Sequence, residues 1–197
     1  MTAINAFDYN ILSWIQDGLR SAAATPIVTF ITHLGDKGIL WILLTIALIC
    51  FRKTRKMGMA CLISMVIGLV VTNLVIKNWA ARPRPYDFFE DLTLIIERQY
   101  DFSFPSGHST NSFACAWVIF RMAKKRYGVP ALILAILIAL SRLYVGVHYP
   151  TDVLAGVAIG ILSAEIAMPV VKLLRRRIPA FKRFTAKKAP SGKRRAA

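Results

Sequence analysis

The sequence predicts an all-α integral membrane protein: a helical bundle of about five transmembrane helices with an amphipathic helix at its N-terminus. Three observations predict this class. The 197 residues are 56% hydrophobic, with a mean hydropathy of +0.51, which is more apolar surface than so small a domain can bury. The chain also carries 26 Lys and Arg against 10 Asp and Glu, a formal charge of +16. Apolar runs alternate with clusters of these charges, a pattern that disfavours both a disordered chain and a soluble globular protein.

The first segment, Ile4 to Leu19, has the pattern of an amphipathic helix. Its larger apolar side chains fall near one helical face: Phe7, Ile11, Trp14, Ile15 and Leu19. We therefore expect residues 1–21 to form an interfacial helix, or an ordinary amphipathic helix packed on the bundle. The first residues are neither basic nor followed at once by an apolar core, so no cleavable signal peptide is predicted.

Residues 22–177 are expected to form the membrane domain. Its first apolar segment, Ala22 to Leu34, is short, and we expect a re-entrant or tilted helix joined through Gly35-Asp36 to the first span. Five further apolar runs are the expected spans: Gly38 to Phe51, Met57 to Ile76, Ser109 to Phe120, Val129 to Leu140 and Val153 to Val171. The second and fifth approach the ~20 residues that a spanning helix needs, whereas the three shorter runs could equally be buried helices of a bundle.

The distribution of charge predicts the orientation in a cell membrane. Three stretches, residues 52–56, 121–126 and 172–197, hold 19 of the 26 basic residues and no acidic residue. The positive-inside rule places these stretches in the cytoplasm. The N-terminal helix, the loop from Lys77 to Pro105 and the turn from Arg142 to Asp152 then lie outside. Five spans connect an outside N-terminus to an inside C-terminus, so the span count and the charge bias agree.

The last segment, residues 178–197, is basic and poor in apolar side chains. We expect a solvated cytoplasmic tail that adheres to anionic lipid headgroups, at roughly 1 kcal/mol per basic residue near the surface. Nucleic-acid binding is the rival interpretation, and we expect no such partner because the tail follows a membrane domain. The three cysteines, Cys50, Cys61 and Cys115, lie in apolar runs, so neither a disulfide framework nor a zinc site is indicated. The pattern indicates no oligomeric state.

Three clusters of polar residues fall on the predicted outer face. They are Lys77 with Arg82-Pro83-Arg84-Pro85, then Pro105-Ser106-Gly107-His108, and finally Ser141-Arg142 with His148 and Asp152. Ionisable residues at the ends of apolar spans are costly, so each cluster is a candidate functional site. Taken singly, Lys77 could snorkel to the interface, Ser106 could merely cap a helix and His148 could be a satisfied interfacial histidine. Their joint occurrence at one membrane face favours a common site.

The residue types match the needs of phosphoryl transfer. A phosphate group requires several fixed cations and N–H donors. Lys77, Arg84 and Arg142 can supply the cations. The backbone N–H groups around Ser106-Gly107, at a helix N-terminus, can supply donors, and glycine lets the backbone approach the phosphate closely.

Two histidines, His108 and His148, can divide the remaining chemistry: one attacks phosphorus and the other protonates the leaving oxygen. Asp152 is spaced to accept an N–H from His148, which would fix the tautomer of that ring. A metal site made from these three residues is the rival interpretation. The three nearby cations would repel a divalent ion, and no second carboxylate lies close in sequence, so we expect neither a metal nor another cofactor.

These motifs resemble the three-part signature of the type 2 phosphatidic acid phosphatase (PAP2) superfamily. The matching patterns are Lys-x6-Arg-Pro from Lys77 to Pro85, Pro-Ser-Gly-His from Pro105 to His108 and Ser-Arg-x5-His-x3-Asp from Ser141 to Asp152. All three match in order and spacing, and the hydrophobic pattern extends the resemblance over roughly residues 25–171. The resemblance implies a helical membrane bundle with metal-independent phosphatase chemistry.

The resemblance also implies a role for each site residue. His148 would be the nucleophile, His108 the general acid and Asp152 the orienting partner. The phosphate ligands would be Lys77, Arg84, Ser106, Gly107 and Arg142. The implied reaction removes the terminal phosphate of undecaprenyl diphosphate, phosphatidylglycerophosphate or phosphatidic acid at the extracytoplasmic face, through a phosphohistidine. Two alternatives remain open: a vanadate-dependent haloperoxidase-like enzyme, which would use a similar anion pocket, and a non-catalytic membrane interaction protein.

Overall fold

The computed structural model describes residues 3–186, which fold into helices joined by turns and loops. The first half contains α1 (Ala3–Gly18), α2 (Ala24–Leu34), the 3-10 turn η1 (Asp36–Gly38), α3 (Ile39–Cys50), α4 (Arg55–Leu69), the π-helical η2 (Val70–Ile76) and α5 (Lys77–Ala80). The second half contains α6 (Pro85–Phe88), α7 (Gly107–Met122), α8 (Lys125–Tyr144), α9 (Pro150–Arg177) and α10 (Pro179–Phe184). The described residues contain no strand, and the predicted all-α class is confirmed.

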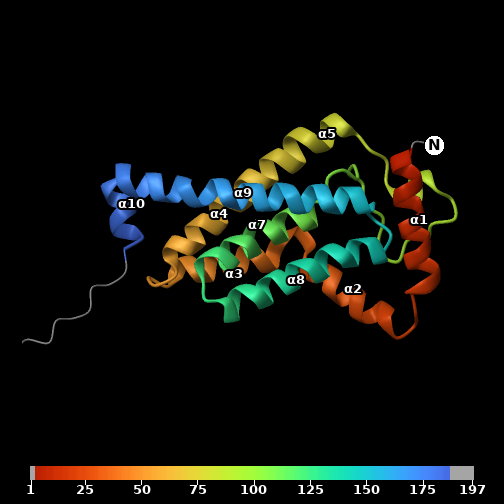
Figure 1. Cartoon of the computed structure of the whole chain (residues 1–197), viewed down its shortest axis with the longest axis horizontal. Helices are drawn as coiled ribbons and strands as arrows, with labels where there is room; N and C mark the ends of the chain where they lie inside the picture. Colours follow the sequence, from red (N-terminus) through yellow and green to blue (C-terminus); the bar gives the residue numbers. More distant parts are fainter. Residues whose placement is uncertain (1–2, 187–197) are drawn as a thin grey trace, which may run out of the picture.

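Helix α7 lies at the centre of the bundle, where it packs against α4, α8 and α9 (Figure 1). Glycine permits the close contact with α9. A Cβ on Gly156 would lie 2.5 Å from the Ser106 carbonyl oxygen, and one on Gly160 would lie 2.6 Å from that of Thr110. Any other residue at these two positions would push the helices apart. This contact brings the start of α9 directly against the start of α7.

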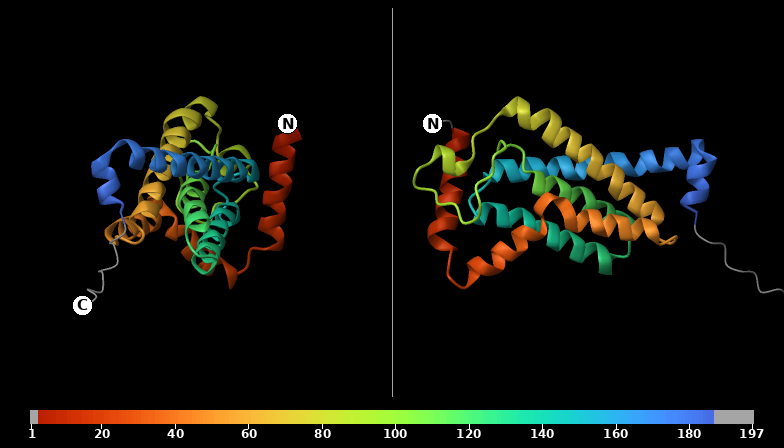
Figure 2. Two further views of the ribbon diagram at one scale, coloured as in Figure 1. Left: turned by 60° about the vertical axis from the view of Figure 1, so that its left-hand side comes forward. Right: turned by 180° about the vertical axis from the view of Figure 1, so that it is seen from behind.

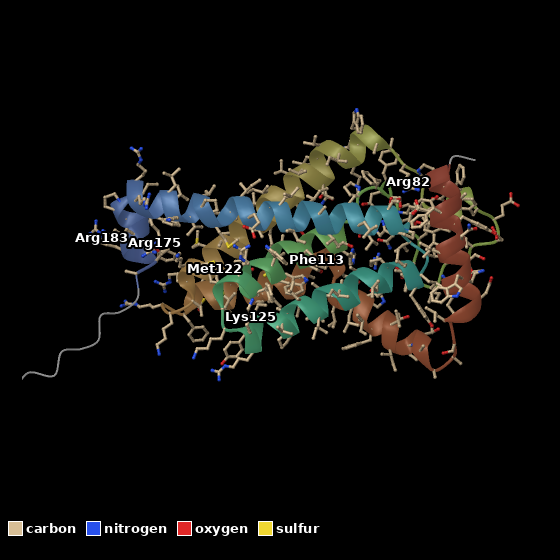
Figure 3. The ribbon with its side chains drawn as sticks, in the orientation of Figure 1. Arg82, Phe113, Met122, Lys125, Arg175 and Arg183 are labelled. Atoms are coloured by element: carbon tan, nitrogen blue, oxygen red, sulfur yellow. The ribbon has the colours of Figure 1, made fainter. Side chains whose placement is uncertain are left out.

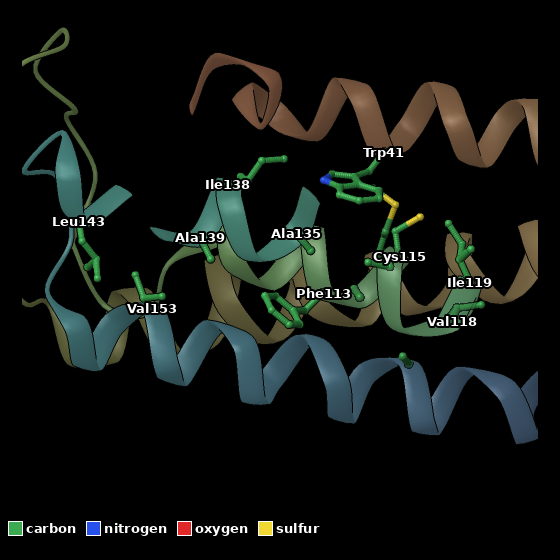
Figure 4. Close-up of a cluster of buried hydrophobic side chains, with 14 of the residues drawn as sticks. Trp41, Phe113, Cys115, Val118, Ile119, Ala135, Ile138, Ala139, Leu143 and Val153 are labelled. Atoms are coloured by element: carbon green, nitrogen blue, oxygen red, sulfur yellow. The ribbon is translucent and has the colours of Figure 1, made fainter. Parts of the chain in front are cut away.

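The apolar core is built from small and branched side chains around one tryptophan (Figure 4). Trp41 of α3 is 1% exposed, and its indole N–H donates to the Ser112 hydroxyl of α7 over 2.9 Å. Cys115 of α7 and Ile138 of α8 are fully buried in the same cluster. A donor in this core has its partner, as buried polar groups require.

The outer faces of the bundle are apolar, as expected of a membrane protein. Large hydrophobic side chains are more than half exposed on three of its helices: Leu43 on α3, Leu140 on α8, and Leu154 and Leu162 on α9. Contiguous apolar surface of this kind is rare in soluble monomers and suits contact with lipid.

Helices form at each of the five expected spans, but their lengths differ. Three are long and apolar enough to cross a membrane: the run 55–88, α8 and α9. A fourth span results if α2 and the segment 36–50, which meet at a bend of 42°, count as one broken helix. The bend lies at the Gly35-Asp36 junction that the sequence predicted. Helix α7, with 16 residues, is shorter than a spanning helix normally is and is mostly buried by its neighbours.

Helix α1 lies across one end of the bundle, crosswise to α9, whereas α10 lies at the other end (Figures 1 and 2). The face of α1 that meets the bundle overlaps the expected apolar face only in part: Ile15 of that face is buried, together with Leu12, which was not assigned to it. The packed face also carries Asp8, which is fully buried and accepts hydrogen bonds from Arg82 and Thr151, each over 2.6 Å. Phe7 and Trp14 of the expected face point away and are 53% and 63% exposed. A buried ion pair and buried apolar side chains therefore anchor α1 together, and only part of its apolar stripe remains exposed.

The described residues of the three basic stretches, 52–56, 121–126 and 172–186, lie at the α10 end, as the charge pattern predicted. They lie at or just beyond the ends of α3, α7 and α9, which meet there (Figure 1). Residues 179–184 of the expected solvated tail form the short helix α10, none of whose residues is buried. Arg55 of α4 packs its guanidinium on the Phe184 ring, 4.5 Å from the centroid, and donates to the Phe184 carbonyl. The rest of the predicted tail, residues 187–197, lies outside the described residues.

Candidate active site

A small polar cavity of about 170 Å³ lies toward the end of the bundle at which α1 packs. Six of the eight predicted site residues line it: Lys77, Arg84, Gly107, His108, Arg142 and His148. They come from α5, the loop before α6, the start of α7, the end of α8 and the segment 145–149 between α8 and α9. The other two, Ser106 and Asp152, lie behind the wall that these residues form. The three motifs therefore converge on one site of the size of a phosphate group.

His148 and Asp152 form a buried pair at the back of the cavity. The imidazole Nδ1 lies 3.4 Å from Asp152 Oδ2, and both side chains are 2% exposed or less. The same carboxylate accepts hydrogen bonds from the Ser103 hydroxyl over 2.5 Å and from the Tyr149 backbone N–H over 2.9 Å. Its second oxygen accepts from Arg82 over 2.7 Å. The carboxylate is thus held from several sides and orients the ring of His148.

Burial lowers the pKa of His148 to about 3. Asp152 acts in the opposite direction, while the positive charges of Arg84 and Arg142 add to the effect of burial. The ring is therefore neutral at physiological pH. A neutral imidazole with one nitrogen on a carboxylate has its other nitrogen free to act as a nucleophile.

His108 has a carboxylate partner of its own, which the motifs did not predict. Its Nε2 lies 3.1 Å from Asp36 Oδ1, and the other oxygen of Asp36 lies 2.7 Å from His33 Nδ1. Gly35 makes the approach possible, because a Cβ there would lie 2.7 Å from His108 Cδ2. The bend between α2 and α3 therefore packs directly on the histidine.

Each histidine therefore contacts a different carboxylate: His108 contacts Asp36, and His148 contacts Asp152. The rival metal site required His108, His148 and Asp152 to converge. Within residues 3–186, no group of three His, Cys, Asp or Glu side chains is arranged to hold a metal ion.

The cationic wall of the cavity is bridged by one carboxylate. Asp101 accepts from Lys77 Nζ over 2.5 Å and from Arg84 over 2.6 Å. Burial raises the pKa of Asp101, but Lys77 and Arg84 outweigh it and lower the value to about 2. Arg84 is held further by the Val147 carbonyl, at 2.7 Å. The carboxylate oxygens of Asp101 thus lie on the cations that the sequence assigned to phosphate.

Arg142 is a buried cation of the cavity wall with an unpaired N–H donor among the described residues. It is 1% exposed and donates to the Thr32 hydroxyl of α2 over 2.6 Å. Its buried Nε–H has no hydrogen-bond partner. A buried guanidinium with an unmet donor is costly unless a ligand completes it, so its place in the cavity wall points to an anion.

Ser106 is the N-cap of α7. Its hydroxyl accepts from Ser109, and its backbone N–H donates to the Asp152 carbonyl over 3.0 Å. Gly107 and His108, the first residues of the helix, have N–H groups with no acceptor within the helix and line the cavity. The structure therefore presents these backbone groups to the cavity, while the Ser106 hydroxyl organises the helix start and its predicted contact with phosphate stays a prediction.

Arg82 lies in the first motif but does not line the cavity. It joins Asp8 to Asp152 and stacks on the Tyr149 ring, 3.7 Å from the centroid. The only sequence signal for this bridging role of Arg82 was its position as a charged residue next to the motif residues. For Ser103 and Asp101 the sequence carried no distinct signal, because both lie in an irregular loop.

Fold and site together define a helical membrane protein with a phosphate-sized anion pocket containing two histidines. The model of the PAP2 superfamily matches residues 58–176, more than half of the chain, and the chain belongs to this superfamily. The sequence-level resemblance is thereby confirmed.

Several proteins to which the chain is similar are named as phosphatases of lipids. The chain is 34% identical to an undecaprenyl-diphosphatase of Sulfolobus acidocaldarius, over 71% of this chain and 66% of the relative, slightly less than two thirds of its length. It is also 34% identical to phosphatidylglycerophosphatase B of Bacillus subtilis, over 73% of each chain. The crystal structure of Aquifex aeolicus LpxE superposes with a TM-score of 0.76 at 27% identity, covering 86% of this chain and 99% of that one.

Proposed function

We propose that the protein removes the terminal phosphate of a membrane lipid phosphate or diphosphate, without a metal and through a phosphohistidine. One observation carries the proposal: the three cations that the sequence assigned to phosphate, Lys37 in addition, and two carboxylate-paired histidines line one cavity of about 170 Å³. Such a cavity accommodates a phosphate group and excludes a hydrocarbon chain. The names of the lipid phosphatases to which the chain is similar support the same class of substrate.

In the first step, the neutral His148 attacks phosphorus. A nitrogen–phosphorus bond forms, the bond from phosphorus to the lipid oxygen breaks, and His108 gives a proton to that oxygen. Asp152 stabilises the positive charge that develops on His148, and Asp36 stabilises the protonated form of His108 before transfer. In the second step, water gives a proton to His108 and attacks phosphorus, the nitrogen–phosphorus bond breaks and inorganic phosphate leaves.

The cationic groups replace a metal in this mechanism. Lys77, Arg84 and Arg142 bind the phosphate oxygens, and the N–H groups at the start of α7 complete the shell, with Ser106 and Gly107 at that start. The unmet Nε–H of Arg142 supports this assignment. Phosphate binding requires Asp101 to release Lys77 and Arg84, because the carboxylate and the phosphate bind the same N–H donors.

The substrate and the face of the membrane are part of the proposal. We expect the substrate to be undecaprenyl diphosphate, phosphatidylglycerophosphate or phosphatidic acid. We expect it to be hydrolysed at the extracytoplasmic face by a multi-pass protein with five spans. The exposed Phe7 and Trp14 support an interfacial position for residues 1–21, with residues 22–177 as the membrane domain. Residues 178–197 are expected at the cytoplasmic face on anionic lipids.

A substrate panel tests the function. Purified protein is given prenyl diphosphates and glycerolipid phosphates in detergent, with and without EDTA, and phosphate release is measured. We expect release from at least one lipid to persist in EDTA and to be inhibited by vanadate, which mimics the trigonal-bipyramidal transition state. Activity abolished by EDTA and restored by Mg²⁺ would contradict the mechanism.

Orientation is tested separately in intact cells. Single cysteines are introduced in a background lacking Cys50, Cys61 and Cys115 and treated with a membrane-impermeant thiol reagent. We expect labelling in the loop between Asp87 and Asp101 and none after Lys172; the reverse pattern would invert the orientation.

A further inference from the structure

A second cavity lies at the end of the bundle opposite the active site. Its volume is about 1290 Å³, and it is bounded by the α3–α4 turn, the α7–α8 turn, Arg175 of α9 and the residues after α10. Figure 3 shows Met122 and Arg175, which line it, far from Arg82 at the α1 end. The active-site cavity measures only about 170 Å³, so the two cavities suit ligands of different size.

The inner wall of this cavity is apolar. Its aliphatic side chains come from four helices: Leu44, Leu48, Met57, Ile119, Met122 and Pro130. Ile119 is buried and the others are partly covered or lie at the edge. Such a wall binds a hydrocarbon chain because apolar surface of the wall and of the chain is buried on contact. The flexible side chains of its two methionines let the wall adapt to the shape of the chain.

The mouth of the cavity is basic. Five cationic side chains line it: Lys53, Lys56, Lys124, Arg126 and Arg175. No Asp or Glu lines it, and within residues 3–186 none of the five cations has an ion-pair partner. The buried Nε–H of Arg175 lacks a hydrogen-bond partner. Five uncompensated cations around one opening repel one another, and an anion placed among them relieves that repulsion.

We propose that this cavity binds one anionic glycerophospholipid from the leaflet at the basic end. Its phosphate lies among the five cations, with Arg175 donating through Nε, and an acyl chain lies along the apolar wall. No histidine lines the cavity, so the lipid is a bound ligand rather than a substrate. This site goes beyond the proposed function. The bound lipid connects the α3–α4 turn, the α7–α8 turn and α9 at the end of the bundle opposite the active site.

The charge pattern favours a lipid over the chain's own C-terminal segment. Residues 187–197 contain five basic residues and no acidic one, so their charge repels the basic mouth instead of matching it. Inorganic phosphate would match the cations but would leave the apolar wall unused. An anionic lipid satisfies both parts of the cavity.

Native mass spectrometry of the delipidated full-length protein tests the proposal. The probes are phosphatidylglycerol and phosphatidylcholine with identical chains. We expect one phosphatidylglycerol to bind at least tenfold more tightly than phosphatidylcholine. Equal binding of the two lipids would overturn the assignment to an anionic ligand.

Matched variants locate the binding. Lys53→Gln/Lys56→Gln/Arg175→Gln should weaken phosphatidylglycerol binding roughly hundredfold, as expected for three basic residues near a headgroup. The control Arg52→Gln/Lys172→Gln/Arg176→Gln removes the same charge at the same end, outside the cavity lining, and should weaken binding less than threefold. Equal losses in the two triple variants would show general surface attraction and overturn the proposal.

Two further variants test the wall and the alternatives. Ala131→Phe fills the apolar wall without changing charge and should weaken binding at least tenfold, while hydrolysis of a soluble phosphate ester shows that the variant is folded. Arg142→Ala, at the active site, should leave lipid binding unchanged; loss there would place the lipid in the active site and overturn the proposal. A truncation after Ala186 that raises lipid affinity tenfold or more would identify the C-terminal segment as the occupant, with the same consequence.

Discussion

Both ends of the bundle gather cationic side chains, but among residues 3–186 the cations that line a cavity are paired with a carboxylate only at the α1 end. At the α1 end, Lys77 and Arg84 share Asp101, and His108 and His148 each contact an aspartate. At the basic end, five cations line a cavity to which the described residues contribute no carboxylate. The first arrangement fixes the positions of its charges, whereas the second leaves long side chains free around an opening.

This difference matches two kinds of anion binding. Chemistry at phosphorus requires donors and histidines that are already in place, because reorganisation during the reaction raises the barrier. The carboxylates supply that order, and Asp101 also competes with the ligand for the same cations. Retention of a lipid requires only attraction and an apolar surface, so unpaired lysines and arginines suffice.

The largest expected contrast comes from the nucleophile. His148→Ala should lower turnover by about 10⁴-fold or more and remove the covalent phosphate, since no other group can form the intermediate. The basic-end variant Lys53→Gln/Lys56→Gln/Arg175→Gln should keep turnover within about twofold of the unaltered protein. Acid-quench trapping with labelled substrate measures both. Phosphate retained on His148→Ala and missing on His108→Ala would show that the two histidine roles are reversed.

The general acid should be recognised by its dependence on the leaving group. His108→Ala should cost roughly 10²–10⁴-fold with a lipid alkoxide as leaving group. The loss should shrink with p-nitrophenolate, which needs little protonation. Steady-state rates on a lipid phosphate and on p-nitrophenyl phosphate give the comparison, and equal losses on both would argue against the acid role.

Asp36 should show the same signature at smaller size. Asp36→Asn removes the negative charge that favours protonated His108, and we expect roughly a tenfold loss on the lipid phosphate, less on p-nitrophenyl phosphate. His33→Ala is the control, because it removes the other partner of Asp36 and leaves the contact with His108 in place. A loss that is the same for both substrates would indicate a structural effect of Asp36 alone.

The smallest expected effect is a gain in anion binding, whereas the other three substitutions lower activity. Asp101→Asn removes the carboxylate charge that occupies Lys77 and Arg84, and vanadate should then inhibit at concentrations about three- to tenfold lower. Because the pKa of Asp101 is lowered to about 2, the competing charge is present at every pH of interest. Asp87→Asn, which alters an exposed pair with Arg98 in the same loop, is the control. Unchanged or weaker inhibition by vanadate in Asp101→Asn would refute the competition.

Much of the fold and the site followed from local pattern. The helices, the bend at Gly35-Asp36 and the basic end depend on apolar runs and charge clusters, which act on neighbouring residues. Six of the eight predicted site residues line one cavity because the three motifs lie at helix ends that meet on one face. Of the expected apolar face of α1, Ile15 packs on the bundle, but the buried Asp8 was not predicted, because its partners Arg82 and Thr151 are distant in the sequence.

What the sequence by itself determined is therefore the class of protein, its helices and the chemistry of its motifs. Tertiary structure alone decided the partners of those motifs. Asp36 reaches His108 across 72 residues, Arg142 reaches Thr32 across 110, and Asp8 reaches Thr151 across 143. Such contacts follow from helix packing, in which Gly35 and Gly156 allow close approach, and a single sequence carries no pattern for pairs so distant in the chain. The lipid-sized cavity at the basic end has the same origin, since its lining comes from five helices and the segment after α10.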